Sequence, residues 1–135
     1  MWVTTQKLQK EMADNTPKTD YFERKLDDKN RLTIPAEIQS ELGRQVVITR
    51  GFGRYLHLYS QKIWDSEMEK ALASDILDER VADLNVKFRT GKSTSNLDAK
   101  QGRVMLETHQ LRYAGITKSV VVVRVGKYWR ISASK

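Results

Sequence analysis

The chain has 135 residues, with 24 Lys and Arg against 17 Asp and Glu, and it contains no cysteine. This length favours one domain, or two very small ones that share a core. The lack of cysteine excludes disulfides, thiolate zinc sites, iron–sulfur clusters and cysteine nucleophiles. No apolar run approaches the roughly 20 residues that span a bilayer, and no secretory signal pattern is present, so we expect a cytoplasmic protein that does not enter a membrane. The net charge of +7 favours a polyanion as partner.

The N-terminal segment and the first strands can be read directly from the residue pattern. Residues 1–20 show no convincing periodicity and are predicted to be a mobile arm. A strand over 21–26 runs into Asp-Asp-Lys-Asn, residues that favour a turn. Alternation of polar and apolar side chains over 31–34 then predicts a second, half-buried strand.

A short helix and two further strands follow. Pro35 suits the first helical position, and Gly43 is placed to supply a left-handed C-terminal cap. Strands are predicted at 46–49 and 55–59, separated by a turn at 51–53.

Residues 61–91 are predicted to be helical. Ser60 is a suitable N-cap for the first helix. Each of the two expected helices has an apolar stripe at helical spacing, made by Trp64, Met68, Ala71 and Leu72 and by Leu77, Val81, Leu84 and Phe88. We interpret both stripes as core contacts.

The second part of the chain repeats the plan of the first. A strand at 103–106, a helix around 107–114 ending at Gly115, and strands at 119–125 and 128–132 follow in the same order, about 72 residues later. We therefore divide the chain into an arm (1–20), a first half (21–60), an insert (61–91) and a second half (92–135).

Charge is unevenly distributed along this plan. Residues 88–135 carry ten bases and only two acids, whereas 64–87 carry three bases and seven acids. This segregation predicts a molecule with one side that attracts phosphate and another that does not.

The duplicated motif points to a known family. Residues 26–38 read LDDKNRLTIPAEI, and the second copy contains LDAKQGRVML at 97–106. With VVITRG at 46–51, FRTG at 88–91 and YAGI at 113–116, the chain resembles the MraZ family of duplicated SpoVT/AbrB-like DNA-binding proteins over residues 21–132.

The resemblance implies both fold and function. It implies an α+β fold of two intertwined SpoVT/AbrB-like β-barrel halves of the swapped-hairpin type, with the helical insert between them. It implies a transcriptional regulator, nucleoid-associated, that binds direct repeats upstream of the division and cell-wall gene cluster as a ring homo-oligomer of about eight subunits. Family members are not enzymes, so no cofactor or small-molecule substrate is expected.

Three departures from the family pattern concern the turns. Asn30 replaces the usual glycine, a mild change because asparagine tolerates positive φ. The second turn has one extra residue, since Asp98 and Arg103 are five positions apart where Asp27 and Arg31 are four apart. In the second half, Glu107 replaces the expected proline and brings an acid towards the proposed DNA face.

The candidate DNA-binding residues lie at these turns. Arg31 and Arg103 begin strands just after them, where a guanidinium can grip phosphate or guanine. The competing interpretation is that each arginine simply pairs with the preceding Asp27 or Asp98, whose own role is to close the turn or to orient the arginine. Phosphate contacts are expected from Lys29 and Lys100 and, in second rank, from Arg24 and Lys25.

Two other function classes compete with a DNA-binding regulator. The first is an AbrB-like antitoxin whose main partner is a toxin protein. The second is a phosphodiester-cleaving enzyme, which the sequence disfavours because the basic regions carry no cluster of metal-ligating carboxylates. His57 and His109 are 52 positions apart without a ligand pattern, so we predict neither a metal site nor a catalytic residue.

Overall fold

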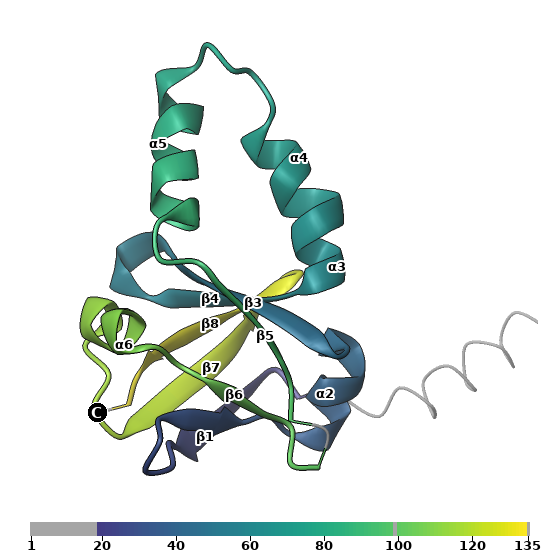
Figure 1. Cartoon of the computed structure of the whole chain (residues 1–135), viewed down its shortest axis with the longest axis vertical. Helices are drawn as coiled ribbons and strands as arrows, with labels where there is room; N and C mark the ends of the chain where they lie inside the picture. Colours follow the sequence, from purple (N-terminus) through teal and green to yellow (C-terminus); the bar gives the residue numbers. More distant parts are fainter. Residues whose placement is uncertain (1–18, 99, 135) are drawn as a thin grey trace, which may run out of the picture.

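The structure is a computed structural model that describes residues 19–98 and 100–134. It is an α+β fold built on two antiparallel sheets. One sheet has six strands in the order β1-β7-β8-β4-β3-β5, and the other has two, β2 and β6 (Figure 1). The predicted α+β class is therefore confirmed.

The predicted elements appear in the predicted order, and one further strand, β5, was not predicted. The strands are β1 (Tyr21–Lys25), β2 (Arg31–Thr33), β3 (Gln45–Arg50), β4 (Leu56–Ser60), β5 (Ser93–Asn96), β6 (Arg103–Met105), β7 (Ser119–Val125) and β8 (Tyr128–Ala133). The helical segments are α2 (Ala36–Leu42), η1 (Phe52–Arg54), α3 (Gln61–Ile63), η2 (Trp64–Met68), α4 (Glu69–Leu72), α5 (Glu79–Arg89) and α6 (Thr108–Ala114).

The strand order has an internal two-fold symmetry that reflects the sequence repeat. Reading the six-stranded sheet from either edge gives the same series, because β5, β3 and β4 repeat β1, β7 and β8 with the halves exchanged. Each edge strand pairs with a strand of the other half: β1 of the first half with β7, and β5 of the second half with β3. The β4–β8 and β2–β6 pairs join the two halves as well, so strands of one half are interleaved with strands of the other.

This interlocking does not close into a barrel. Among the described residues, β1 and β5 are the two edges of an open sheet, and β2 and β6 form a separate ribbon. Both halves contribute to one core, with Leu32 and Ile34 of the first half buried against Val104 and Leu106 of the second. A single shared core makes the two repeats depend on each other for burial of apolar surface.

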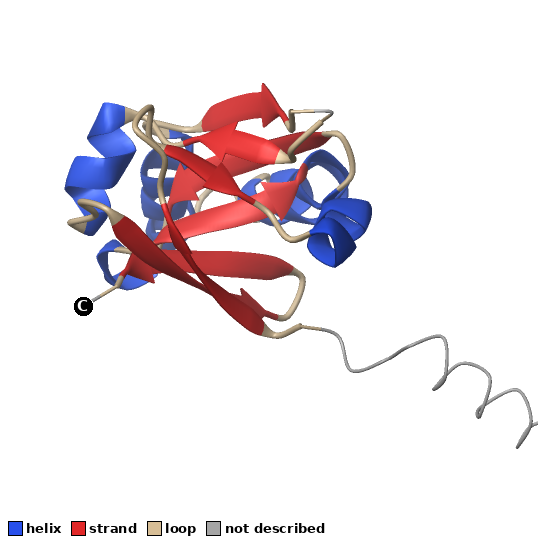
Figure 2. Ribbon diagram, turned by 90° about the horizontal axis from the view of Figure 1, so that it is seen from below, coloured by secondary structure: helices blue, strands red, loops and turns tan. Residues whose placement is uncertain are grey.

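The short helices occupy equivalent places in the two halves and lie at opposite edges of the molecule (Figures 1 and 2). The helix α6 ends at Gly115 in the predicted left-handed conformation, with φ 63° and ψ 34°. Gly43 is the predicted C-cap of α2 and has a positive φ of 78°, but its ψ of −165° lies outside the left-handed helical region. Pro35 is the N-cap rather than the first helical residue, because α2 begins at Ala36.

The insert forms a helical hairpin above the sheet (Figure 1). Ser60 caps its first helix as predicted, accepting a hydrogen bond from the backbone N–H of Ile63 at 3.0 Å. Trp64, Leu72 and Phe88 are buried in a second apolar cluster over the sheet. Leu77 does not join it: the residue precedes α5 and is 92% exposed, so its predicted core role is wrong.

Part of the predicted arm is described. Residues 1–18 lie outside the described part of the chain. Thr19 and Asp20 are described, and both backbone carbonyls accept hydrogen bonds from Arg124. Within the described residues, no helix is long and apolar enough to cross a bilayer.

Candidate nucleic-acid interface

The β2–β6 ribbon has one buried face and one open face. Leu32 and Val104 are opposite each other and point into the core. The alternation of the strands turns the flanking positions outward, so that Arg31, Thr33, Arg103 and Met105 share the outer face. Met105 is 51% exposed there.

The first turn is closed by Asp27. Its Oδ1 accepts hydrogen bonds from the backbone N–H groups of Lys29 and Arg31, at 2.9 and 2.8 Å. Asn30 has φ 60°, the left-handed conformation that the substitution for glycine was expected to tolerate. The predicted turn-closing role of this aspartate is confirmed.

The second turn is also closed by an aspartate and leads into its strand in the same conformation, in spite of its extra residue. Asp98 Oδ1 accepts from the backbone N–H groups of Lys100 and Gln101, at 2.8 and 3.2 Å. Gly102 has φ 63°, which matches Asn30 of the first turn. The turn therefore absorbs the additional residue before the strand begins.

Matching hydrogen bonds show that the ribbon register is preserved. The N–H of Ile34 donates to the carbonyl of Gly102 at 2.9 Å, and the N–H of Leu106 donates to that of Asn30 at 3.0 Å. The internal two-fold symmetry relates one of these hydrogen bonds to the other. Glu107, in place of the second proline, has its N–H bonded to Gln110 Oε1 at 3.0 Å and is the N-cap of α6.

Both arginines are engaged by aspartates. Arg31 Nε lies 2.7 Å from Asp27 Oδ2, and Arg103 Nη2 lies 2.7 Å from Asp98 Oδ2. The side chains are 28% and 21% exposed. The Arg–Asp pairing that competed with DNA contact is thus present, and each arginine side chain remains partly exposed.

These contacts keep the aspartates ionised. The Arg103 side chain, followed by the N–H groups of the turn, lowers the pKa of Asp98 to about 2. Backbone N–H donation from Arg31 is the main cause of a lowered pKa at Asp27. Two cations and two anions therefore meet on the ribbon, and their charges cancel. Positive charge in this region comes from the bases around the ribbon.

The lysines and the β1 bases differ in how they are held. Lys29 and Lys100 are exposed on the two turns. Lys25 is also exposed, at the end of β1. Arg24 is half-buried: its Nη1 donates to the Glu23 carbonyl at 2.8 Å, and its guanidinium lies over the Phe22 ring. Three of these four bases are therefore directed to solvent.

Two bases that were not predicted flank the ribbon. The carbonyl of Lys118 accepts from the N–H of Leu26 at 2.7 Å, and that of Arg44 accepts from the N–H of Leu97 at 2.8 Å. Each therefore stands beside a turn of the opposite half, with its side chain exposed. Neither forms an ion pair within the described residues. In the sequence, Arg44 immediately precedes β3 and Lys118 immediately precedes β7. Their position beside the turns could not be predicted, because it depends on the pairing of strands between the two halves.

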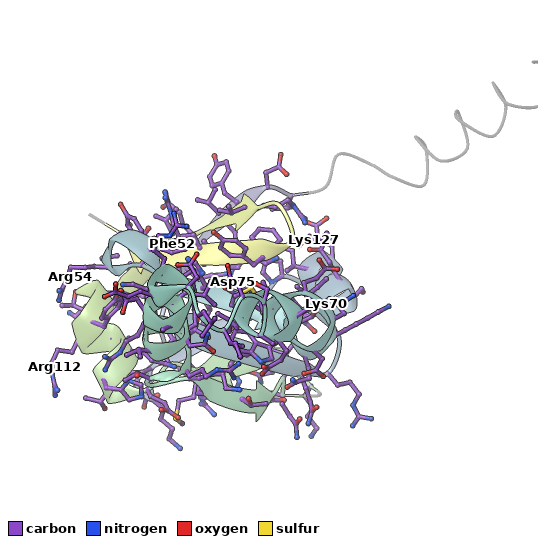
Figure 3. All side chains as sticks on the ribbon, turned by 90° about the horizontal axis from the view of Figure 1, so that it is seen from above. Phe52, Arg54, Lys70, Asp75, Arg112 and Lys127 are labelled. Carbon is purple, nitrogen blue, oxygen red and sulfur yellow. The ribbon has the colours of Figure 1, made fainter. Side chains whose placement is uncertain are left out.

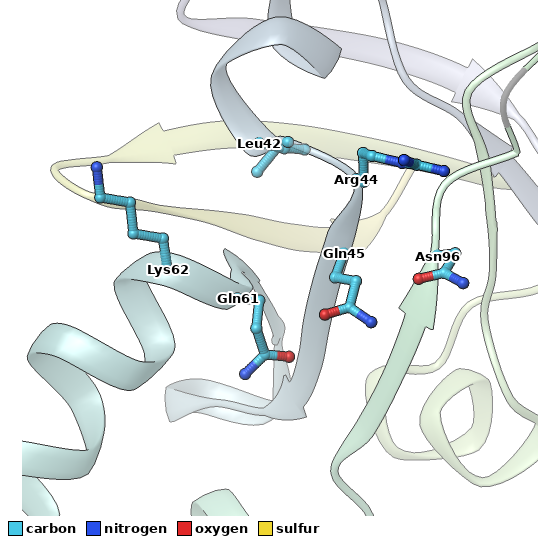
Figure 4. Close-up of a pocket in the computed structure, with 7 residues that line it drawn as sticks. Leu42, Arg44, Gln45, Gln61, Lys62 and Asn96 are labelled. Carbon is cyan, nitrogen blue, oxygen red and sulfur yellow. The ribbon is translucent and has the colours of Figure 1, made fainter.

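An open hollow extends from the second turn along the side of the molecule. One part, about 600 Å³, is lined by Asp98, Asn96 and Arg44 among others. It adjoins a second part of about 560 Å³, where Arg44 and Lys62 are accompanied by side-chain amides (Figure 4). The basic surface thus continues beyond the ribbon.

Comparison with known proteins identifies the family. Residues 19–85 match the family described as "MraZ protein, putative antitoxin-like". A relative named Transcriptional regulator MraZ from Carboxydothermus hydrogenoformans is 36% identical over 101 residues, which cover 75% of this chain and 70% of the relative. Relatives of the same name from Moorella thermoacetica and Halothermothrix orenii are 41% and 32% identical, over 74% and 84% of this chain and 69% and 79% of their own. The chain belongs to the MraZ family.

In this MraZ-family chain, the acidic insert and the ribbon lie at opposite ends. Figure 1 shows the helical hairpin at the top and the two turns of the ribbon at the bottom. The seven acids of 64–87 are therefore carried by the end remote from the ribbon. This arrangement agrees with the two-sided charge distribution predicted from the sequence.

The two histidines of this MraZ-family chain lie apart. His57 is buried among aromatic rings and bonded to the Tyr59 hydroxyl at 2.8 Å. His109 is in α6, with Nε2 2.8 Å from Glu107 Oε1. Across residues 19–98 and 100–134, no three His, Asp or Glu side chains are grouped in a way that could hold a metal ion.

Proposed function

We propose that the protein is a non-enzymatic, sequence-specific DNA-binding regulator of transcription whose reading element is the β2–β6 ribbon. The observation that carries the proposal is the pair of symmetry-related arginines, Arg31 and Arg103, on the open face of that ribbon. Membership of a family whose relatives are named transcriptional regulators supports the same function.

The dimensions of the ribbon suit a DNA groove. The major groove of B-DNA admits a two-stranded β-ribbon, and several known regulators read bases in this way. The outer face offers two guanidiniums, a threonine hydroxyl and a methionine, which together can bond base edges and contact a thymine methyl group. Leu32 and Val104 anchor the opposite face in the core, so the ribbon is presented on a rigid support.

Asp27 orients Arg31 towards that groove, whereas Asp98 already occupies Nη2 of Arg103. Asp27 engages Arg31 through Nε, and within the described residues the two Nη groups of Arg31 have no hydrogen bond. Those groups are the ones that form the planar fork for guanine O6 and N7. A fixed guanidinium loses less side-chain entropy on binding, which raises affinity.

The surrounding bases supply the phosphate contacts. Lys29 and Lys100 act from the turns, and Lys25 and Arg24 act from β1 in a secondary role. Phosphate contacts of this kind fix the register of a protein on the duplex without reading sequence. They also make the affinity fall steeply with salt, because each neutralised phosphate releases counterions.

One subunit offers a small reading surface, so we propose that several act together. A ring of about eight subunits engaging direct repeats near one helical turn apart, about 10 bp, would gain affinity through effective concentration. The proposed target is the region upstream of the division and cell-wall gene cluster. We also propose that the interlocked halves are the single-chain equivalent of a swapped-hairpin pair of barrel halves.

Binding to the region upstream of the protein's own gene tests this function. Mass photometry of the full chain, with and without that duplex, measures assembly and binding together. We expect a large homo-oligomer that binds the duplex and prefers it over a scrambled duplex of equal composition. Equal affinity for both duplexes would contradict sequence-specific regulation.

The alternative partner is a toxin protein, and the phrase "antitoxin-like" in the family description favours testing it. AbrB-like antitoxins use a tail to wrap the toxin. Here β8 pairs with both β7 and β4 and is therefore occupied within the sheet. Recovery of a stoichiometric small protein with the tagged chain would support this alternative over DNA binding alone.

A further inference from the structure

Three cations converge on one tyrosine at a site away from the ribbon. The guanidinium carbons of Arg50 and Arg54 lie 5.3 and 5.4 Å from the centre of the Tyr113 ring. Lys87 Nζ lies 5.9 Å from the same centre and 3.3 Å from the hydroxyl oxygen. We call these four residues the Tyr113 cluster.

The cluster brings together segments that are far apart in the sequence. Arg50 ends β3, Arg54 belongs to η1, Lys87 comes from the insert helix α5 and Tyr113 from α6. The tyrosine is fixed because its hydroxyl donates to the Gly51 carbonyl at 2.7 Å. The position of the cations is therefore a property of the folded molecule and not of one flexible loop.

The positive charge of the cluster is not neutralised by the described residues. None of the three cations forms an ion pair with a described carboxylate, and Arg50 Nε is buried without a hydrogen-bond partner. The nearby Glu107 is bonded instead to His109. The three positive charges around one ring repel one another in the folded protein. An anion bound beside them would reduce this repulsion.

The other half of the molecule shows how such a cost is normally removed. By the strand registers, Arg124 of β7 is the equivalent of Arg50. Glu41 of α2 is the equivalent of Tyr113, because each lies two residues before the glycine C-cap of its helix. Glu41 accepts two hydrogen bonds from Arg124, at 2.8 and 3.0 Å. The repeats have diverged at this pair: a carboxylate satisfies the arginine in one half, and an aromatic ring leaves it unpaired in the other.

The cluster lies on an open edge of the molecule. Arg54 is exposed, and Arg112, one residue before Tyr113, is exposed as well. Figure 3 shows Arg54 and Arg112 extending from the same edge, away from Lys70 and Lys127 on the other side. Two exposed arginines therefore lie on this edge of the molecule.

We propose that the Tyr113 cluster is a binding site for a phosphate group. A phosphate offers several acceptor oxygens to guanidinium and ammonium donors and carries enough charge to balance more than one of them. The phosphate can belong to a free phosphate-containing ligand or to the backbone of bound nucleic acid. In either case the site is additional to the ribbon.

Titration of the full chain with inorganic phosphate tests the site, with chloride at matched ionic strength as reference. Tyr113→Glu places a carboxylate where the other half has Glu41, and Arg54→Gln removes an exposed cation without changing the core. Each substitution is expected to raise the Kd for phosphate about tenfold, Tyr113→Glu because its carboxylate competes for the cations and Arg54→Gln because a charge-assisted hydrogen bond is lost. Lys70→Gln, which removes an exposed insert base, should leave the Kd unchanged.

A second measurement distinguishes the two sources of the phosphate. If the group belongs to DNA, Arg54→Gln should reduce the slope of log affinity against log salt by about 0.9, the value for one phosphate. If it belongs to a free ligand, the slope should stay unchanged while the Kd for phosphate rises about tenfold. Absence of saturable phosphate binding in the wild type, or binding that both substitutions leave intact, would overturn the inference. A wild type that binds duplex but not phosphate would refute this site alone and leave the proposed function standing.

Discussion

Arg103 of the second half places its Nη1 3.8 Å from the carboxylate of Asp27 in the first half. The same guanidinium donates through Nη2 to Asp98 at 2.7 Å. Because Asp27 also holds Arg31, the two turns are linked electrostatically across the ribbon. The ribbon, our proposed reading element, is therefore one unit built by both repeats.

The first prediction concerns the two arginines of this element. Arg31→Ala and Arg103→Ala should each weaken binding to the upstream duplex by about 1–3 kcal/mol, the discrimination typical of one bidentate base contact. Fluorescence anisotropy with specific and scrambled duplexes measures the change. Because Arg103 also bridges two aspartates, we expect its replacement to lower the melting temperature more than that of Arg31.

A matched substitution separates base reading from general charge. Arg80→Ala removes an exposed arginine from the acidic insert and should leave affinity unchanged. If Arg31→Ala bound both duplexes as the wild type does, the ribbon would not be the reading element.

The sequence predicted the repeat, the ribbon strands and the turns because these depend on local patterns. Asp27 and Asn30 determine their turn within a few residues, and the alternation around Leu32 defines the buried face. The same spacing could not decide between pairing of Arg31 with Asp27 and free projection, since both satisfy it. The structure shows the pairing.

Long-range contacts account for what the sequence did not predict. Lys118 reaches the first turn only because β1 pairs with β7, nearly a hundred residues away. The Tyr113 cluster needs α5, η1 and α6 to meet, which no local pattern encodes. Leu77 fitted a helical stripe, but Asp78 caps the helix after it and excludes it.

The second prediction concerns Arg44 and Lys118, the bases beside the turns. Their alanine variants should weaken binding to specific and scrambled duplexes equally, because phosphate contacts carry no sequence information. Each should also reduce the slope of log affinity against log salt by about 0.9. Lys70→Ala serves as the comparison, since Lys70 is an exposed base of the insert helix α4. A loss confined to the specific duplex would show that these residues read bases.

The third prediction tests the equivalence of Asn30 and Gly102. A Cβ at Gly102 would meet Gln39 at 2.0 Å, and φ is 63° there. Gly102→Ala should therefore reduce the free energy of unfolding by roughly 1–3 kcal/mol, combining backbone strain with displacement of the Gln39 side chain from the Ile34 carbonyl.

Asn30→Gly is the matched control, because φ at Asn30 is 60° and glycine adopts this conformation readily. Urea denaturation should give a free energy of unfolding within about 0.5 kcal/mol of the wild type. If Gly102→Ala were equally neutral, the second turn would have to adopt a different conformation from the first.

The fourth prediction concerns the buried His57. Burial, with smaller contributions from Arg130 and Lys87, lowers the pKa of this imidazole to about 4. Between pH 6.5 and 4 the unfolded chain binds a proton that the folded chain does not, so the free energy of unfolding should fall as the pH is lowered. The loss across the whole window is about 3 kcal/mol.

Urea denaturation from pH 7 to 4 should show this fall in the wild type and a shallower one in His57→Gln, which cannot titrate. Parallel curves for the two proteins would mean that other groups carry the acid sensitivity, and that His57 accepts a proton without leaving its aromatic surroundings.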